Sequence, residues 1–354
     1  MSEAMKVGPQ ARAGRELRVA ISMPTMDGVP LKEIPGLARM AEDAGLHSAW
    51  TGEFFHHDGY VILTSMALAT QKITVGSSIS YAFMRSPTLT AAAAMDIDEL
   101  SGGRFILGLG TGTRTMQEDW YSIPYEPVAA KLKETIQLIR YLWSCQKGKP
   151  ARFEGRFYKI NIPQYARPHA VREQIPIYTA AVNRLMLRTA GEAADGLVGH
   201  PLYSRRYLKE VVIPTVEEGL GRSGRRREDF TLTSLVITVV NKDRQMARRI
   251  AKYQIAQYSA VKTYGAILDL HGWEEEKAKA QAALRSWDLE RMADSVSEEM
   301  VDAIAVAGTP DECRRRLREY DGLLDLPLLM GPYNGVPIDV ALENYRAIVE
   351  TFGR

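Results

Sequence analysis

The sequence predicts an α/β fold, a single (β/α)8 TIM barrel with insertions at its C-terminal face. Short runs of β-branched and apolar residues alternate with segments of helical periodicity along most of the chain. Eight such runs occur, and most are followed by a helix, as parallel strands joined by long crossovers require. No change in composition and no Pro/Ser-rich linker marks a boundary between two domains. We therefore expect residues 18–354 to form the barrel and residues 1–17 to be a disordered or loosely packed tail.

The predicted strands are the short apolar runs, and the predicted helices are the segments between them. The strands cover 18–24, 48–53, 72–80, 104–110, 175–181, 195–199, 230–240 and 326–332. The helices cover 31–46, 60–71, 86–103, 126–144, 184–194, 208–222, 309–320 and 338–352, with a longer helical region over 242–300. A barrel takes about 250 residues, which leaves about 100 for insertions at 113–126, 147–174 and 260–305. A doubly wound sheet is the main alternative, and it would need fewer strands or a second domain.

The composition is that of a soluble globular protein, with 45% hydrophobic residues, 25% charged residues and a net charge of +2. This balance predicts neither a nucleic-acid partner nor an acidic membrane surface as a partner. No apolar run reaches the roughly 20 residues of a membrane span, and the N-terminus lacks the apolar core of a signal peptide. The two cysteines, Cys145 and Cys313, lie far apart and fit a reducing compartment. We expect a cytoplasmic protein.

The segment LGLGTGT, residues 107–113, places three glycines and two threonines at the end of a predicted strand. A dinucleotide-binding turn needs G-x-G-x-x-G after the first strand and a helix directly behind it. Here the strand is the fourth, Thr113 takes the place of the last glycine, and Pro124 and Pro127 interrupt any immediate helix. Small residues at the carboxyl end of a barrel strand let a planar group or a phosphate lie against the backbone. The alternative is that these glycines only relieve crowding at the rim. The predicted cofactor-site residues are Gly110, Thr111, Gly112 and Thr113.

The segment DELSGGRFILGLGTG, residues 98–112, resembles the bacterial luciferase-like superfamily of flavin-dependent oxidoreductases. That superfamily includes two-component FMN monooxygenases and enzymes that depend on the deazaflavin coenzyme F420. The resemblance continues in LARMAEDAGLHSAWTGE (37–53), in IPIYTAAVNRLMLRTAGEAADGLV (175–198) and in AVAGTPDECRRRLREY (305–320). Residues 67–105 are similar in particular to methylenetetrahydromethanopterin reductase.

The resemblance implies a cofactor with its ring in the barrel mouth. The third strand of the family ends in a bulge, often with a non-proline cis peptide, that supports the ring; an ordinary strand end is the alternative. The phosphate of the cofactor is implied to bind where a strand meets the helix that Asn183 caps. Many relatives have Gly-Pro there, where this chain has Val-Asn. The residues matched to the bulge are Ser78, Ile79 and Ser80, and those matched to the phosphate site are Ala181, Val182 and Asn183.

Glu53 is the predicted catalytic or cofactor-positioning acid. Relatives commonly carry an acidic residue followed by histidine after the second strand, and Phe54 stands in place of that histidine. A carboxyl in an apolar barrel mouth has a raised pKa, which suits proton transfer near neutrality. The alternative is a structural ion pair with a buried Arg or Lys. His56 and His57 are adjacent and cannot normally face one metal ion together, so we expect no metal site.

Other segments are less specific. RTMQEDWYSIPY (114–125) could form a substrate wall or pack at the rim, and 260–305, with Trp273 and Trp287, could act as a lid. Family members usually dimerise through helices of the second and third units. We therefore expect a homodimer through LTSMALATQ (63–71) and LTAAAAMDIDEL (89–100), both rich in small residues.

The resemblance implies an oxidoreductase or monooxygenase that acts on a small organic substrate with a reduced cofactor. With coenzyme F420 the reaction would be hydride transfer. With FMN it would be monooxygenation by O2, and a separate reductase would be a partner. A barrel that binds flavin or another ligand without catalysis is the alternative. A Schiff-base lyase is disfavoured, because it needs a lysine at the carboxyl end of a strand and Lys72 begins its strand.

Overall fold

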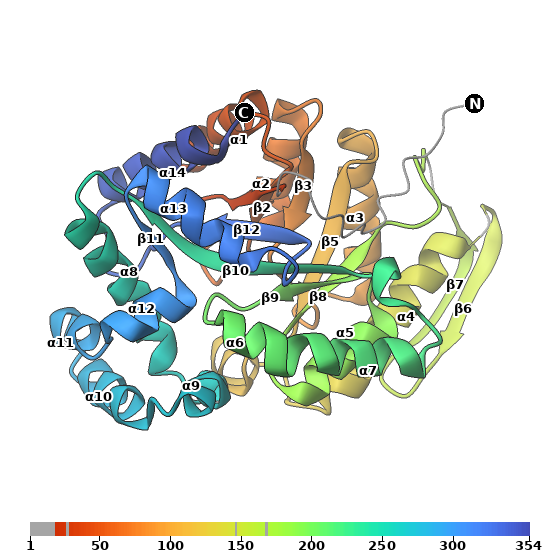
Figure 1. The fold of residues 1–354 in the computed structure, drawn as a ribbon. Coiled ribbons are helices and arrows are strands. Elements are labelled where there is room, and N and C mark those ends of the chain that lie inside the picture. Colours follow the sequence, from red (N-terminus) through yellow and green to blue (C-terminus); the bar gives the residue numbers. More distant parts are fainter. Residues whose placement is uncertain (1–17, 26–27, 146, 167–168) are drawn as a thin grey trace.

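A computed structural model describes residues 18–25, 28–145, 147–166 and 169–354. Within these residues eight parallel strands close into a barrel, as Figure 1 shows from the side. The ring closes where β12 pairs with β1, with Ala20 opposite Leu328. This arrangement confirms the predicted (β/α)8 barrel, whereas the predicted tail over 1–17 lies outside the described residues. The ring order is β1 (Ala20–Ser22), β2 (Ser48–Thr51), β3 (Thr74–Ser77), β5 (Phe105–Gly110), β8 (Ile177–Ala181), β9 (Gly196–Gly199), β10 (Thr231–Val240) and β12 (Leu326–Met330).

Helices cover the outside of the barrel, close to the predicted ranges (Figure 1). No helix of the described part is long and apolar enough to cross a membrane. The helices that follow the strands are α1 (Ile34–Asp43), α2 (Gly59–Ala69), α3 (Pro87–Leu100), α4 (Val128–Ser144), α5 (Arg184–Ala193), α6 (Arg205–Tyr207), α7 (Ile213–Arg222), α8 (Arg244–Ser259), α13 (Pro310–Leu317) and α14 (Ile338–Phe352).

The insertion at 147–174 is more regular than the sequence predicts. It contains an antiparallel hairpin, β6 (Lys149–Glu154) and β7 (Lys159–Tyr165), at the right of Figure 1. The Glu134 carboxylate of α4 accepts hydrogen bonds of 2.7–2.9 Å from the backbone N–H groups of residues 156–158 in the hairpin turn. The anchor of the hairpin is thus a tertiary contact, which periodicity within the segment cannot reveal.

The predicted helical region over 242–300 is divided into separate helices. A further strand, β11 (Val306–Gly308), follows them and extends β10, with Thr238 opposite Val306. The sequence prediction missed this strand because three residues are too short to give a pattern. The helices after α8 are η6 (Lys262–Tyr264), α9 (Gly265–His271), α10 (Glu274–Arg285), α11 (Leu289–Asp294) and α12 (Glu298–Ile304).

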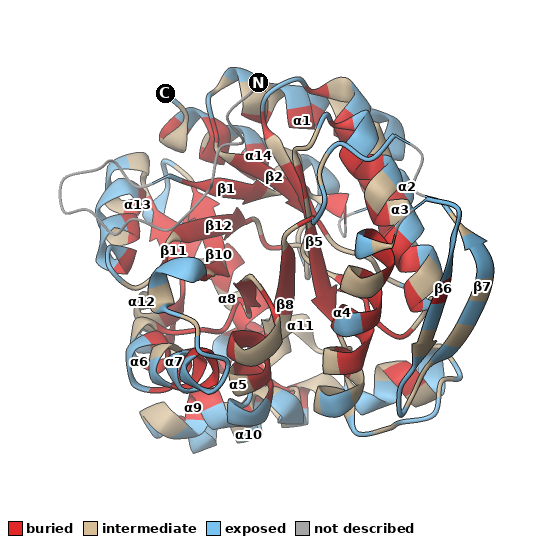
Figure 2. Ribbon diagram, turned by 90° about the vertical axis from the view of Figure 1, so that its right-hand side faces the viewer, coloured by how far each residue is buried: buried red, intermediate tan, exposed pale blue. Residues whose placement is uncertain are grey.

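The barrel interior is packed with side chains, while a larger cluster fills the space between the strands and the helices, so that the strands are buried (Figure 2). Trp50 is fully buried inside, and its ring centroid lies 5.9 Å from that of Tyr178. Functional sites of this fold lie at the carboxyl ends of the strands, called the barrel mouth below. The interior residues are Ala20, Trp50, Tyr178, Val198, Leu326 and Leu328.

A buried ion pair connects α3 and β5 to the segment before β8. The Asp98 carboxylate, whose side chain is 4% exposed, accepts hydrogen bonds from Arg172 Nη2 at 2.6 Å and Arg172 Nε at 3.0 Å. The backbone N–H of Phe105 donates to the same carboxylate at 3.4 Å. Loss of one partner leaves buried polar groups of the other without compensation.

We expect Asp98→Ala to lower the free energy of unfolding by about 3 kcal/mol, because the Arg172 guanidinium loses its carboxylate. Urea unfolding followed by circular dichroism measures this loss. Glu343→Ala removes an exposed carboxylate of α14, away from this pair, and should change stability by less than about 0.5 kcal/mol. Equal effects of the two substitutions would contradict the role of the buried pair.

Candidate active site at the barrel mouth

The third strand ends in the bulge that the family resemblance implies. The peptide bond between Ser78 and Ile79 is cis, and a short strand, β4 (Ser80–Tyr81), then pairs with the end of β5. Two hydrogen bonds connect the bulge to the end of β2 and the segment that follows it. The N–H of Ser78 donates to the Thr51 carbonyl at 2.7 Å, and the N–H of Glu53 donates to the Ile79 carbonyl at 2.9 Å. The expected bulge is therefore confirmed, and its cofactor role stays a prediction.

Gly110 lies under the Ile79 side chain. A Cβ atom at Gly110 would come within 2.6 Å of Ile79 Cδ1, so any larger residue would force the Ile79 side chain to move. Gly112 has a φ of 67°, a left-handed conformation that favours glycine. Thr113 Oγ1 accepts the N–H of Met116 at 3.2 Å, at the start of a short π-helix, η3 (Met116–Trp120). The glycine-rich segment thus fits around the bulge, and Thr111 and Gly112 remain partly exposed beside it.

The predicted phosphate site lies where β8 meets α5. Asn183 caps the helix as predicted, and its Oδ1 accepts the N–H of Met186 at 3.0 Å. The Tyr203 hydroxyl donates to the Ala181 carbonyl, and the Tyr207 hydroxyl donates to the Val182 carbonyl at 2.9 Å. In a trans peptide the N–H points opposite to the carbonyl. The N–H groups of residues 182 and 183 therefore point away from the two tyrosines. Backbone N–H groups at a helix N-terminus are the donors that bind an anion such as a phosphate.

Glu53 forms the ion pair that was the structural alternative, and its role as an acid stays a prediction. Its Oε2 accepts the Tyr81 N–H at 3.0 Å, and its Oε1 lies 3.5 Å from Arg85 Nη2. Arg85 also binds Asp58, and its guanidinium lies 4.9 Å from the Tyr60 ring centroid. The Glu53 side chain is 10% exposed, and burial raises its pKa against the opposing effects of the Tyr81 N–H and Arg85. A carboxyl held in this way can keep or release a proton near the bulge.

Four aromatic residues that the sequence did not single out form the other side of the mouth, and we call them the aromatic wall. The ring centroid of His200 lies 3.8 Å from that of Tyr264 and 4.7 Å from that of Tyr258. The hydroxyl oxygens of Tyr258 and Tyr333 are 2.9 Å apart. His200 directly follows a predicted strand, and this position was the available sequence signal. The members of the aromatic wall are His200, Tyr258, Tyr264 and Tyr333.

The segments 114–125 and 260–305, which the sequence suggested as a substrate wall and a lid, lie in different parts of the structure. Trp120 packs edge-on against Phe54 and Phe55 at the rim, with ring centroids 5.6 and 5.7 Å away. In the 260–305 insertion, Trp273 is buried and stacks on His271, whereas Trp287 is 66% exposed. Tyr264 of this insertion packs against His200 of the aromatic wall.

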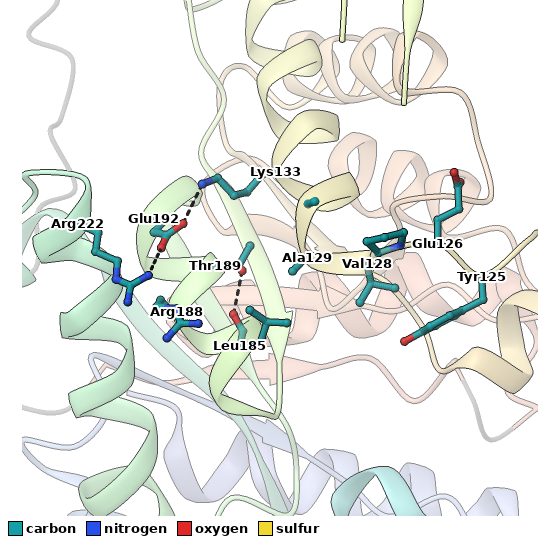
Figure 3. A pocket seen from close by; sticks show the side chains of 12 residues that line it. Tyr125, Glu126, Val128, Ala129, Lys133, Leu185, Arg188, Thr189, Glu192 and Arg222 are labelled. Carbon is teal, nitrogen blue, oxygen red and sulfur yellow. Dashed lines mark hydrogen bonds and ion pairs between the residues drawn. The ribbon is translucent and has the colours of Figure 1, made fainter. Parts of the chain in front are cut away.

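A hollow of about 750 Å³ lies outside the mouth, between α4 and α5 (Figure 3). Glu192 pairs there with Lys133 at 2.8 Å and with Arg222 at 3.6 Å, as the dashed lines show. The paired charges leave little attraction for an anion. Among the described residues, no group of three or more His, Cys, Asp or Glu side chains could hold a metal ion.

One polar atom at the bulge fits a bound ligand. The Oγ atom of Ser78 is buried and has no hydrogen-bond partner in the described part of the chain. A buried hydroxyl without a partner costs free energy unless a ligand or water binds it. This hydroxyl therefore fits a polar cofactor ring on the bulge.

Comparison with known proteins identifies the family. The luciferase-like monooxygenase family matches residues 14–325. The chain belongs to this family. An uncharacterized protein of Mycobacterium tuberculosis is 34% identical over 326 residues, covering 88% of this chain and 95% of that protein. A 5,10-methylenetetrahydromethanopterin reductase of Archaeoglobus fulgidus is 30% identical over 294 residues, covering 81% of this chain and 85% of that protein.

A solved structure shares the fold over nearly all of the chain. The coenzyme F420-dependent tetrahydromethanopterin reductase of Methanopyrus kandleri superposes with a TM-score of 0.82 at 23% identity. The match covers 95% of this chain and 98% of that chain. The family and the barrel inferred from the sequence are thus both confirmed, and the family is one of oxidoreductases and monooxygenases, which supports an enzyme of this class.

Glu53 should give folding stability a distinctive pH dependence. Its raised pKa means that, above the ordinary value of 4.5, the folded protein holds a proton that the unfolded chain has released. The free energy of unfolding of the wild type should therefore fall, relative to Glu53→Gln, as pH rises from about 4.5 to the raised pKa. Urea unfolding at several pH values between 4 and 8 measures the two slopes, and Glu343→Gln on the exposed face of α14 is the control. Parallel slopes for wild type and Glu53→Gln would contradict the prediction.

Proposed function

We propose that this chain is an oxidoreductase that acts on a small organic substrate at the barrel mouth with reduced coenzyme F420. The bulge at Ser78 and Ile79, with its buried hydroxyl and its glycine partner, is the observation that carries the proposal. The 30% identity with a methylenetetrahydromethanopterin reductase, together with the likeness of residues 67–105, favours F420. Reduced FMN is the second candidate, supplied by a separate reductase. It is favoured by Phe54, which occupies the place of the histidine common in deazaflavin relatives.

Different residues of the mouth would bind different parts of the cofactor. Ile79 would support the ring from below, and Ser78 Oγ would bond to one of its polar atoms. The segment 110–113 would border the ribityl chain, and the N–H groups of residues 182 and 183 would bind the phosphate at the start of α5. When bound, the reduced deazaflavin supplies a hydride to an electrophilic carbon of the substrate.

Glu53 would donate the proton that the reaction transfers to the substrate. Its Oε2 is held by the Tyr81 N–H, and Arg85 shares its charge between Glu53 and Asp58. Because burial favours the protonated form, Oε1 can donate to a substrate atom beside the bulge and then remain ionised against Arg85. A ligand-binding barrel without catalysis is the alternative, and it would bind the cofactor without turnover.

Gly110→Ala tests the cofactor site. The added methyl group would push against Ile79, at a cost of about 1–3 kcal/mol if the bulge must move. We expect the affinity for F420 to fall by about tenfold or more, measured by the fluorescence of oxidised and reduced F420 and compared with FMN. Gly36→Ala is the matched control, because a Cβ there meets nothing within 4 Å.

The outcomes separate the candidates. Preference of the wild type for F420 supports hydride transfer, and preference for reduced FMN supports monooxygenation. Unchanged affinity in Gly110→Ala would contradict the placement of the ring on the bulge. Binding of neither cofactor would overturn the proposed function.

We further propose that the protein is a cytoplasmic homodimer that associates through α2 and α3. Both helices expose large apolar side chains, which single soluble chains rarely gather on neighbouring helices. The exposed residues are Val61 at 60%, Leu68 at 60%, Leu89 at 62% and Leu100 at 46%.

Charge on this surface should separate the subunits. We expect Leu68→Glu and Leu89→Glu to shift the protein from dimer to monomer in size-exclusion chromatography with light scattering, because each buries a carboxylate in an apolar interface. Met246→Glu, at an exposed methionine of α8, should leave the dimer intact. A wild-type monomer would reject the dimer.

A further inference from the structure

The aromatic wall lies across the barrel from the bulge. In the closed ring, β3 is followed by β5, β8, β9, β10, β12, β1 and β2, so β10 is opposite β3, with β9 and β12 on either side of it. His200 follows β9, and Tyr333 follows β12. Tyr258 and Tyr264 lie at the end of α8 and in η6, after β10. All four side chains are partly exposed. The wall therefore faces the proposed ring position from the other half of the mouth.

The two sides of the mouth are close enough to interact. Tyr81, directly after the bulge, packs on Tyr121 with ring centroids 5.5 Å apart. Tyr264 and Tyr333 act electrostatically on Tyr81, and Tyr81 in turn acts on Tyr258. The bulge and the wall thus border the same space at the mouth, in which the proposed substrate would lie.

The wall is uncharged at physiological pH. Burial lowers the pKa of His200 to about 3 and raises that of Tyr264 to about 12. His200 Nδ1 accepts the N–H of Leu202 at 3.2 Å, so the neutral ring carries its proton on Nε2. Nε2–H and the phenol hydroxyls are hydrogen-bond donors in a neutral surface.

A charged substrate would find no matching charge on this wall. The groups that act electrostatically on Tyr258 are three other phenols, and the one that acts on Tyr264 is Tyr333. A carboxylate or phosphate placed here would lose water without gaining a cation. An ammonium group would meet the Nε2–H donor of His200 and find Glu53 already bound to Arg85.

We propose that the aromatic wall is the substrate-recognition surface of the mouth, and that the substrate is an uncharged planar compound with a carbonyl oxygen bound by His200 Nε2–H and the Tyr264 hydroxyl. The planar part stacks among the phenol rings, which favours unsaturated rings over bulky saturated ones. The inference rests on the proposed function, because it takes the bulge as the place of the cofactor.

Three six-membered rings of matched size test it: 2-cyclohexen-1-one, cyclohexene-1-carboxylate and cyclohexylammonium. Their binding is measured by isothermal titration calorimetry, with the protein alone and with the protein saturated with its cofactor. We expect the enone to bind at least about tenfold more tightly than either ion. Tyr264→Phe and His200→Asn should each weaken enone binding about five- to tenfold, while the affinity for the cofactor stays the same.

Each variant removes one hydrogen-bond donor and should leave the fold unchanged, so that a loss of enone binding reports on the donor. His200→Asn keeps an acceptor for the Leu202 N–H and removes the Nε2–H donor. Tyr141→Phe is the control, because its hydroxyl accepts the N–H of Arg152 on β6, away from the mouth. It should bind the enone as the wild type does.

Several results would overturn the inference. These are tighter binding of either ion, no enone binding in both forms of the protein, and equal enone binding by the wild type and both wall variants. Failure of the cofactor to bind would instead remove the proposed function, and the ring titrations without cofactor would still report on the wall.

Discussion

The close approach of the Ile79 side chain to the Cα of Gly110 is the contact on which the arrangement of the mouth depends. For Ile79 to reach that position, the third strand must leave its regular pairing after Ser77 and resume it at Ser80. The bulge then presents a carbonyl to Glu53 and places the Tyr81 N–H against the Glu53 carboxylate. Gly110 thus leaves room for the Ile79 side chain, and the hydrogen bonds of Ile79 and Tyr81 with Glu53 hold the acid beside the bulge.

The electrostatics of the mouth follow from the same geometry. Glu53 is largely buried because it sits between the bulge and the start of α2, and Arg85 balances its charge together with that of Asp58. Across the barrel the groups are phenols and a neutral imidazole, whose charged forms burial disfavours. The ionisable character of the mouth is thus concentrated on the bulge side. On the proposed function, proton exchange would belong to the side proposed for the cofactor, and the other side would select a ligand by shape and hydrogen bonding.

The sequence predicted the barrel well, because each strand is a short apolar run and the next helix follows within a few residues. The glycine-rich segment was located from the residues themselves, at the end of a strand that can be recognised. The bulge, the Asn183 cap and the position of Glu53 were located through the family resemblance, which periodicity alone does not supply. The hairpin β6–β7 escaped prediction because its anchor is Glu134, a residue of another element. The aromatic wall was not predicted either, for a similar reason. Tyr258, Tyr264 and Tyr333 come from a helix end, an insertion and a loop, and only the closed ring brings them to His200.

This difference between the two sides of the mouth has a physical origin. The bulge side is built from residues 51–113, where consecutive strand ends are neighbours in the ring, so that local sequence patterns predict its contacts. The wall is built from residues 200–333, where an insertion of several helices separates β10 from β12 along the chain although the two strands pair in the barrel. Side chains held by such an insertion can change without disturbing the strands that support the bulge. A family that keeps one cofactor surface while its substrates vary would therefore carry its specificity on this side, and the neutral aromatic wall is the form which that side takes in the present chain.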